Sequence, residues 1–301
     1  MTDSRPLDTG AFWSLPEPMR EAIKSAWQED VGPGDITSAA CVPSGAVEAA
    51  GFLVKGEGVL AGLAVAQAVF AFGAPEVEFK PLAQDGSRVH PGMVVARVEG
   101  PAAQILTAER LALNFMQRMS GVATVTRRIV EALEGTKTRV LDTRKTTPGL
   151  RHFEKQAVVI GGGVNHRFGL FDQILIKDNH IDYVGTVEAA LEGAHRHLAE
   201  VGRAVPVVVE VRNFAEAQAA FAAGGADRLL LDNFSPDEAR EVVDHLAGRI
   251  PTEASGGLTP DTVRAYADAG VDFVSLGWLT HSPQSLDISL KSAAALAALQ
   301  K

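Results

Sequence analysis

Residues 207–234 read VVVEVRNFAEAQAAFAAGGADRLLLDNF, in which two apolar runs enclose a segment of helical character. Apolar runs without alternation are typical of parallel strands that are buried on both faces, and a helix between two such strands forms a βα unit. The first run ends at Glu210 and the second at Asp232. This stretch therefore predicts two parallel strands, each with a carboxylate at its carboxyl end.

The same pattern extends outward in both directions. Four further apolar runs end at polar or glycine-rich stretches, which are Asp142–Lys145, Lys177–His180, Ser255–Gly257 and Gly277. Reactive groups at the carboxyl ends of successive parallel strands are typical of the working face of an α/β barrel. The sequence thus predicts an α/β fold whose chemistry lies at these strand ends.

Composition indicates a cytoplasmic enzyme rather than a binder of polymers. The 301 residues can bury a large core and suit two domains. With 28 Lys and Arg against 37 Asp and Glu, the net charge is −9, which disfavours nucleic acid and anionic membranes as partners. Cys41 is the only cysteine, as suits a reducing compartment. The N-terminal stretch lacks the apolar core of a signal peptide, and no apolar stretch reaches the roughly 20 residues of a membrane span.

Local patterns also predict how the chain is organised. We expect helices over 17–30, 60–72 and 106–133, the last broken near Ser120 and Gly121, and strands over 46–55 and within 76–98. An alanine-rich helix is expected over 286–299. These elements predict an N-terminal α/β domain at 1–115, a barrel domain at 116–283, and a C-terminal helix (284–301) that packs back on the first domain.

Positive charge gathers in one part of this acidic chain. Residues 139–180 contain seven Lys or Arg and four Asp or Glu, which gives a local charge of +3. Arg144 and Lys145 follow Thr143 at a predicted strand end; the guanidinium suits a carboxylate or phosphate, and the ammonium is a movable point charge. Lys177 ends another strand and is either a Schiff-base nucleophile or a permanent cation for an anionic ligand. The cluster predicts a small, strongly anionic ligand.

Three glycines at 161–163 precede His166 and Arg167. Their spacing matches neither a P-loop nor a dinucleotide-binding motif. We expect them to let the backbone bend so that His166 and Arg167 face inward.

The remaining strand ends carry carboxylates and glycines. Glu210 and Asp232 would either neutralise the cations or bind Mg²⁺ that carries a phosphorylated substrate. Ser255–Gly257 and Leu276–Gly277 end the last two strands, where barrels commonly bind phosphate through backbone N–H groups. A small anionic acid would bind the cations, and a Mg²⁺-bound sugar phosphate would bind the carboxylates and the glycine-rich strand ends.

Six segments together resemble the quinolinate phosphoribosyltransferase family. They span nearly the whole chain and are EDVGPGDIT (29–37), ERLALNFMQRMSGVAT (109–124), DTRKTTPGLR (142–151), GGGVNHRFGLFDQILIKDNHI (161–181), EASGGL (253–258) and SLGWLTHS (275–282). The resemblance implies an N-terminal α/β sandwich domain, an incomplete α/β (TIM-like) barrel, and an active site shared across a homodimer. The implied reaction transfers phosphoribosyl from phosphoribosyl pyrophosphate to quinolinate with decarboxylation, giving nicotinate mononucleotide, CO₂ and pyrophosphate in NAD biosynthesis.

The resemblance also implies roles for individual residues. Arg144, His166, Arg167 and Lys177 would hold the two carboxylates of quinolinate, Lys145 would lie close to both substrates, and Arg110 would reach into the partner subunit's barrel. Glu210 and Asp232 would bind the ribose hydroxyls and Mg²⁺. The 5-phosphate would lie at the remaining candidates, Ser255, Gly256, Gly257, Leu276, Gly277 and Trp278. The expected catalytic residues are Lys145, Lys177, Glu210 and Asp232.

Two positions depart from the family pattern, and three other functions stay open. Gln156 stands where an aromatic residue is often found, and Trp278 where a small residue is common. A molybdate-transport-associated homologue would use a different acceptor, and we expect it to lack the Asn165–Arg167 and Lys177–His180 patterns. A barrel lyase would use Lys177 as a Schiff base, and a non-catalytic binding protein would tolerate loss of Glu210 and Asp232.

Overall fold

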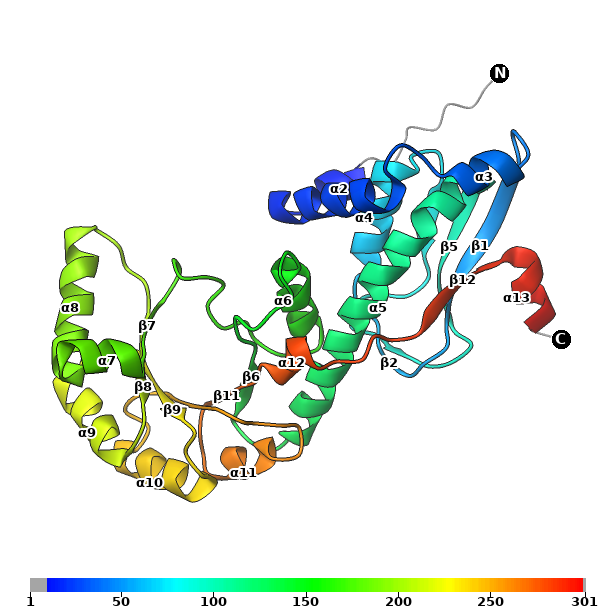
Figure 1. Ribbon diagram of the computed structural model, residues 1–301. Helices are drawn as coiled ribbons and strands as arrows, with labels where there is room; N and C mark the ends of the chain where they lie inside the picture. The colour runs from blue at the N-terminus through cyan, green and yellow to red at the C-terminus, as the bar shows by residue number, and fades with distance from the viewer. Residues whose placement is uncertain (1–9, 300–301) are drawn as a thin grey trace. The chain divides into compact units, whose positions relative to one another are not determined.

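A computed structural model of the protein describes residues 10–299 (Figure 1). The chain divides into two compact units. Within the described range, the first unit takes the residues up to Val125, Thr147–Gly161 and the residues from Pro283 onward. The second unit takes Thr126–Thr146 and Gly162–Ser282.

The second unit is built on a parallel sheet. Within residues 10–299 this sheet has six strands in the order β6-β11-β10-β9-β8-β7, which are β6 (Arg139–Leu141), β7 (Ile174–Ile176), β8 (Val207–Val211), β9 (Arg228–Asp232), β10 (Thr252–Ser255) and β11 (Phe273–Ser275). Each strand coincides with one of the six predicted apolar runs. The sheet order has two ends, β6 and β7, so the barrel is incomplete. The predicted α/β fold class is confirmed.

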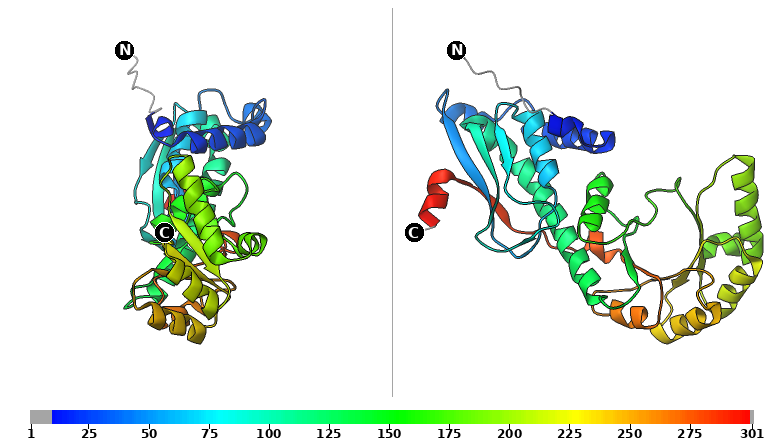
Figure 2. Two further views of the ribbon diagram at one scale, coloured as in Figure 1. Left: turned by 90° about the vertical axis from the view of Figure 1, so that its left-hand side faces the viewer. Right: turned by 180° about the vertical axis from the view of Figure 1, so that it is seen from behind.

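Helices follow the strands along the outer side of this sheet (Figures 1 and 2). Ser235 begins one of them with a capping box, in which its side chain accepts from the backbone of Glu238 and the Glu238 carboxylate accepts from Ser235. This capping fixes the start of that helix, three residues after β9 ends at Asp232. The helices of this unit are α7 (Asp178–Val184), α8 (Val187–Glu200), α9 (Phe214–Ala223), α10 (Pro236–Leu246), α11 (Val263–Asp268) and α12 (Trp278–His281).

The first unit combines an antiparallel sheet with helices. Within the described chain the sheet order is β12-β1-β5-β3, and a separate pair joins β2 to β4. Its strands are β1 (Val47–Val54), β2 (Gly58–Val59), β3 (Glu78–Pro81), β4 (Arg88–Val89), β5 (Val94–Pro101) and β12 (Ile288–Ser292). Its helices are α1 (Gly10–Trp13), α2 (Glu17–Val31), α3 (Ile36–Cys41), α4 (Leu63–Gly73), α6 (Arg151–Ile160) and α13 (Ala293–Leu299). The helices predicted over 17–30 and 60–72 correspond to α2 and α4.

The predicted break near Ser120 and Gly121 is wrong. Helix α5 runs without interruption over Ala102–Ala132. The Ser120 hydroxyl donates to the Ala61 carbonyl and accepts from its N–H, and a side chain at Gly121 would collide with the backbone of Gln284. The glycine therefore permits close packing rather than ending the helix. Although α5 has 31 residues, no helix within residues 10–299 is long and apolar enough to cross a membrane.

The C-terminal segment also differs from the prediction of a helix over 286–299. Ile288–Ser292 forms β12, which pairs antiparallel with β1, and only Ala293–Leu299 is helical. The pairing partner lies far away in the sequence, so local composition could not indicate it. The residues from Pro283 onward fall in the first unit, and the chain divides at 125/126, whereas the predicted boundary is at 115/116. Residues 1–9 and 300–301 of the predicted domains lie outside the described residues.

Asp272 links strands at the amino ends of the second unit's sheet. Its carboxylate accepts from the backbone N–H of buried Thr252 at 2.9 Å and from Lys137 Nζ at 2.8 Å. Burial raises the pKa of Asp272, but Lys137 and Thr252 outweigh burial and hold the pKa below its ordinary value. The ionised carboxylate thus contributes stability above the unfolded-state pKa of about 3.9, and this contribution is lost as the pH falls through the lower folded value.

We expect Asp272→Ala to lower the free energy of unfolding by about 1–3 kcal/mol at neutral pH, because it leaves the buried Thr252 N–H without its acceptor. Urea denaturation across pH 2–7 would measure the loss, which should shrink at the acid end. Asp268→Ala is the matched control, because it removes an exposed ion pair with Arg264 and should cost less than about 1 kcal/mol. Equal losses in the two variants would contradict the assignment.

Candidate active site

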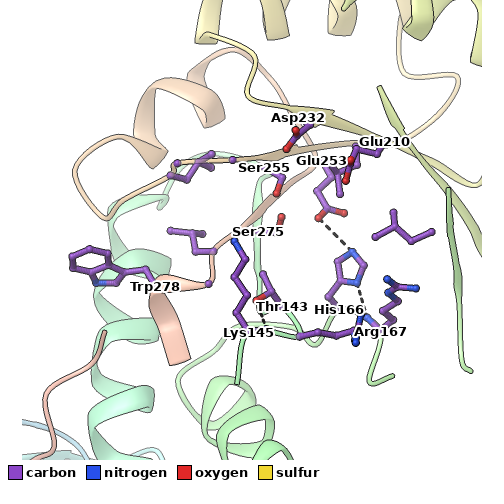
Figure 3. A pocket seen from close by; sticks show the side chains of 18 of the residues that line it. Thr143, Lys145, His166, Arg167, Glu210, Asp232, Glu253, Ser255, Ser275 and Trp278 are labelled. Atoms are coloured by element: carbon purple, nitrogen blue, oxygen red, sulfur yellow. Dashed lines mark hydrogen bonds and ion pairs between the residues drawn. The ribbon is translucent and has the colours of Figure 1, made fainter. Parts of the chain in front are cut away.

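A cavity of about 530 Å³ opens at the carboxyl ends of the parallel strands, within the second unit (Figure 3). This volume suits small-molecule substrates. Fourteen of the fifteen candidate residues line it, namely Thr143, Arg144, Lys145, His166, Arg167, Lys177, Glu210, Asp232, Ser255, Gly256, Gly257, Leu276, Gly277 and Trp278. The structure thus brings together residues that are spread over 136 positions of sequence, from Thr143 to Trp278.

Two guanidinium groups lie close to each other on one side of the cavity. Burial lowers the pKa of Arg167, and the charge of Arg144 lowers this pKa further, while Asp172 and Glu210 oppose the shift. Arginine nevertheless stays charged in proteins. Because two like charges repel in partly buried surroundings, an anion between them would relieve a real electrostatic cost.

Lys145 is held by its backbone. Its N–H donates to the Thr143 hydroxyl at 3.0 Å, and its carbonyl accepts from the buried Thr280 hydroxyl at 2.6 Å. A side chain at Gly277 would collide with the Lys145 aliphatic chain. Thr280 therefore fixes the backbone of Lys145, and Gly277 leaves room for its side chain at the cavity wall.

Lys177 and Glu210 face each other across the ends of neighbouring strands. Lys177 Nζ lies 3.2 Å from Glu210 Oε2, with the lysine side chain 47% exposed and the glutamate side chain 8% exposed. An ion pair with a carboxylate favours the charged ammonium, whereas Schiff-base chemistry requires a neutral amine. This geometry supports the interpretation of Lys177 as a permanent cation.

The last strand ends form a tight backbone turn. Gly256 has φ +95°, and a side chain there would collide with Asn233. The Asn233 amide donates to Asp232 Oδ2 at 2.8 Å, and its backbone N–H donates to the Ser255 carbonyl at 2.9 Å. Asn233 thus contacts both the glycine turn and the Asp232 carboxylate and positions one relative to the other.

Glu210 and Asp232 are the candidate metal ligands. Residues 10–299 contain no cluster of three or more His, Cys, Asp or Glu side chains that could hold a metal ion. A site enclosed by protein ligands is therefore absent from the described part of the chain. Mg²⁺ commonly binds through one or two carboxylates together with substrate phosphates. The donor set fits Mg²⁺ only in that form.

Four polar residues of the cavity were not anticipated from the sequence, namely Glu253, Thr259, Ser275 and His281. Glu253 and Ser275 lie within strands β10 and β11 rather than beyond their ends, and His281 ends α12. The carboxylate of Glu253 within a strand predicted to be buried was the available signal. His281 carried none, because an isolated histidine at a helix end is unremarkable.

Three other predicted features lie outside the cavity. The glycines 161–163 do not line the cavity; Gly162 has φ +96°, consistent with the predicted bend. Arg110 is exposed on α5 in the first unit and is not part of this chain's cavity, so its predicted place in a partner subunit stays a prediction. Gln156 lies in α6 of the first unit, whereas Trp278 lines the cavity.

An incomplete α/β barrel with cations, a carboxylate pair and a glycine turn at its strand ends defines an enzyme that acts on small anionic substrates. Two family models cover most of the chain. The N-terminal domain of quinolinate phosphoribosyl transferase matches residues 35–120, and the C-terminal domain matches residues 122–291. The chain therefore belongs to the quinolinate phosphoribosyl transferase family.

Individual relatives agree with this assignment. The chain is 42% identical over 272 residues to the probable nicotinate-nucleotide pyrophosphorylase [carboxylating] of Bacillus subtilis, covering 90% of this chain and 92% of that protein. It is 41% identical to quinolinate phosphoribosyltransferase [decarboxylating] 2b of Nicotiana tabacum, covering 91% of this chain and 82% of the relative. Among solved structures, NadC from Streptococcus pyogenes matches with a TM-score of 0.87 at 42% identity, covering 92% of this chain and 96% of that one.

Proposed function

We propose that this protein transfers the phosphoribosyl group of phosphoribosyl pyrophosphate to quinolinate, with loss of CO₂, to form nicotinate mononucleotide and pyrophosphate. The observation that carries this proposal is the placement of a cation cluster beside a carboxylate pair in one cavity of a member of this family. The cations suit a diacid, and the carboxylates suit a sugar whose ring becomes positive.

The acid binds on the side of the cavity that holds Arg144, Arg167 and Lys177. Two guanidinium groups and one ammonium can each form charge-assisted hydrogen bonds with the two carboxylates of quinolinate. A monoacid such as nicotinate would leave part of this positive charge uncompensated. The pocket therefore favours the diacid.

The sugar donor binds at the carboxylate pair and the glycine turn. Glu210 and Asp232 accept hydrogen bonds from the ribose hydroxyls and hold Mg²⁺, which stabilises charge on the departing pyrophosphate. The 5-phosphate lies against Ser255–Gly257 and Gly277, where backbone N–H groups can donate to it. Lys145 lies between the two substrate regions.

No protein nucleophile is required for this reaction. As the bond to pyrophosphate breaks, positive charge grows on the ribose ring, and Glu210 and Asp232 stabilise it. The ring nitrogen of quinolinate attacks the anomeric carbon, so the protein contributes positioning and electrostatics. The carboxylate next to the new cationic nitrogen then leaves as CO₂. The electron pair of the broken C–C bond stays on that ring carbon, beside the positive nitrogen, and the carbon takes up a proton from water.

The direct test combines the protein with Mg²⁺, phosphoribosyl pyrophosphate and either quinolinate or nicotinate. Pyrophosphate and nicotinate mononucleotide are measured together. We expect product with quinolinate and none with nicotinate. Activity should be lost in EDTA and should return when Mg²⁺ is added.

Release of pyrophosphate with another acid, but not with quinolinate, would refute quinolinate as the acceptor. A sugar donor that is not consumed at all would favour a lyase or a binding protein. For the lyase, borohydride would trap a carbonyl substrate on Lys177.

The glycine turn gives a separate prediction for the sugar donor. We expect Gly256→Ala to raise the KM for phosphoribosyl pyrophosphate, because the added methyl group displaces Asn233 and with it Asp232. The matched control is Gly248→Ala, where φ is +72° but nothing lies within 4 Å of the added carbon. Steady-state kinetics would measure the KM of both variants. An equal rise of this KM in Gly248→Ala would show that displacement of Asn233 is not the cause.

We also infer that the protein is a cytoplasmic homodimer in which Arg110 of each subunit completes the partner's acid site. Its exposure on α5 and the exposed apolar side chains Leu170, Phe171 and Tyr183 support this inference. The single, exposed Cys41 suits a reducing compartment.

Subunit exchange tests the shared site. Arg110→Ala and Glu210→Gln should each be nearly inactive alone, yet their mixture should recover up to about a quarter of wild-type activity, because half of the dimers are mixed and contain one intact site. Light scattering would establish the dimer. Failure of a mixed dimer to regain activity would show that Arg110 serves its own chain or no site.

A further inference from the structure

Glu253 is a buried carboxylate in the cavity wall that the proposed reaction does not use. It lies in β10, its side chain is fully buried, and it is directed toward His166 (Figure 3). Burying a carboxylate is costly unless nearby charges compensate for lost hydration. Its position beside the acid site therefore indicates a role in that site.

Arg228 and His166 lie beside this carboxylate. Arg228 Nε lies 2.9 Å from one Glu253 oxygen, and His166 Nε2 lies 3.4 Å from the other. Burial raises the pKa of Glu253, but His166 and then Arg228 outweigh burial and hold the pKa below its ordinary value. The Arg228 guanidinium supplies the permanent positive charge beside this carboxylate, and the His166 ring lies at the long end of hydrogen-bond distance from it.

Both ring nitrogens of His166 face groups of the protein. The backbone N–H of Arg167 donates to Nδ1 at 2.7 Å. A ring nitrogen that accepts a hydrogen bond carries no proton, so the proton of His166 resides on Nε2, facing Glu253. The His166 side chain is only 7% exposed, and its backbone N–H donates to buried Asp142 at 2.7 Å. His166 is thus fixed at both its ring and its backbone.

We propose that Glu253 is a positioning residue that acts through the His166 ring to hold the backbone of Arg167 and direct its guanidinium toward the acid substrate. His166 then supports Arg167 instead of binding a substrate carboxylate itself, which differs from the role implied by the family resemblance. The identity of the acid rests on the proposed function, whereas the arrangement of Glu253, His166 and Arg167 does not.

The protonation of His166 in the substrate-free protein provides the first test. Long-range ¹H–¹⁵N spectra of the imidazoles would be recorded, with His166 assigned by its loss in His166→Asn. We expect a ring that is protonated at Nε2 and unprotonated at Nδ1. A ring protonated at Nδ1, or at both nitrogens, would overturn the proposal whether or not quinolinate is the substrate.

The second test separates positioning from charge compensation. Glu253→Gln should weaken quinolinate binding roughly tenfold in calorimetry and leave the affinity for phosphoribosyl pyrophosphate nearly unchanged. The double variant Glu253→Gln/Arg228→Met removes the uncompensated arginine and should recover thermal stability, yet it should bind quinolinate as weakly as the single variant. Recovery of quinolinate affinity along with stability would overturn the proposal. Absence of quinolinate binding in the wild type would instead refute the proposed function.

Discussion

Arg144→Ala and Arg167→Ala are each expected to raise the KM for quinolinate by roughly 10- to 150-fold. Each variant removes one charge-assisted contact to a carboxylate, worth about 1.5–3 kcal/mol. The KM for phosphoribosyl pyrophosphate should change less, because the sugar donor is proposed to bind the carboxylate pair and the glycine turn instead of the two arginines. Steady-state kinetics with each substrate varied in turn would measure both constants.

Arg212→Ala is the matched control for these variants. Arg212 also follows a strand of the parallel sheet, but it pairs with Glu216 and Asp182 and does not line the cavity. It should leave both KM values unchanged. If the KM for quinolinate were unchanged in each of the two single variants, Arg144→Ala and Arg167→Ala, the assignment of the acid site would be refuted.

Glu210→Gln and Asp232→Asn should reduce kcat by about 10²- to 10³-fold, as expected when a preorganised group that stabilises transition-state charge is removed. Both substitutions keep the size of the side chain and remove only its negative charge. Glu210→Gln also releases Lys177 from its ion pair, so its KM for quinolinate is expected to change as well. Single-turnover measurements would separate the chemical step from product release.

Asp237→Asn serves as the control for the carboxylate pair. Asp237 lies in the first turn of α10, shortly after Asp232, and is exposed outside the cavity. Its loss should leave kcat unchanged. A non-catalytic binding protein would retain ligand binding in the Glu210 and Asp232 variants and would show no turnover in the wild type.

The barrel and most of its cavity could be predicted from the sequence because the relevant pattern is local. Most of the strands are short apolar runs, and candidate side chains lie at or directly after their carboxyl ends, as with Asp232 at the end of β9 and Lys177 after β7. Parallel pairing then brings these ends together without any further information. Fourteen separate residues therefore meet in one cavity as expected.

Features that depend on distant contacts could not be predicted in this way. Gly121 suggests a helix break until the backbone of Gln284 is placed against it, and Ile288–Ser292 becomes a strand only because β1 is available for pairing. Glu253 likewise gains its role from His166 and Arg228, which lie 87 and 25 positions away. Tertiary contacts outweigh local propensity at each of these positions.

The two ends of the incomplete barrel have a consequence for aggregation. A sheet that does not close leaves unpaired N–H and C=O groups along its outer strands, and such edges can recruit a strand from another chain. Here the outer strands β6 and β7 have three residues each, as does the inner strand β11, and Val164 occupies part of the outer edge of β6 by hydrogen bonds with Val140 and Asp142. Very short edge strands offer few groups for intermolecular pairing. The brevity of β6 and β7 thus protects an open barrel from self-association while the chain folds.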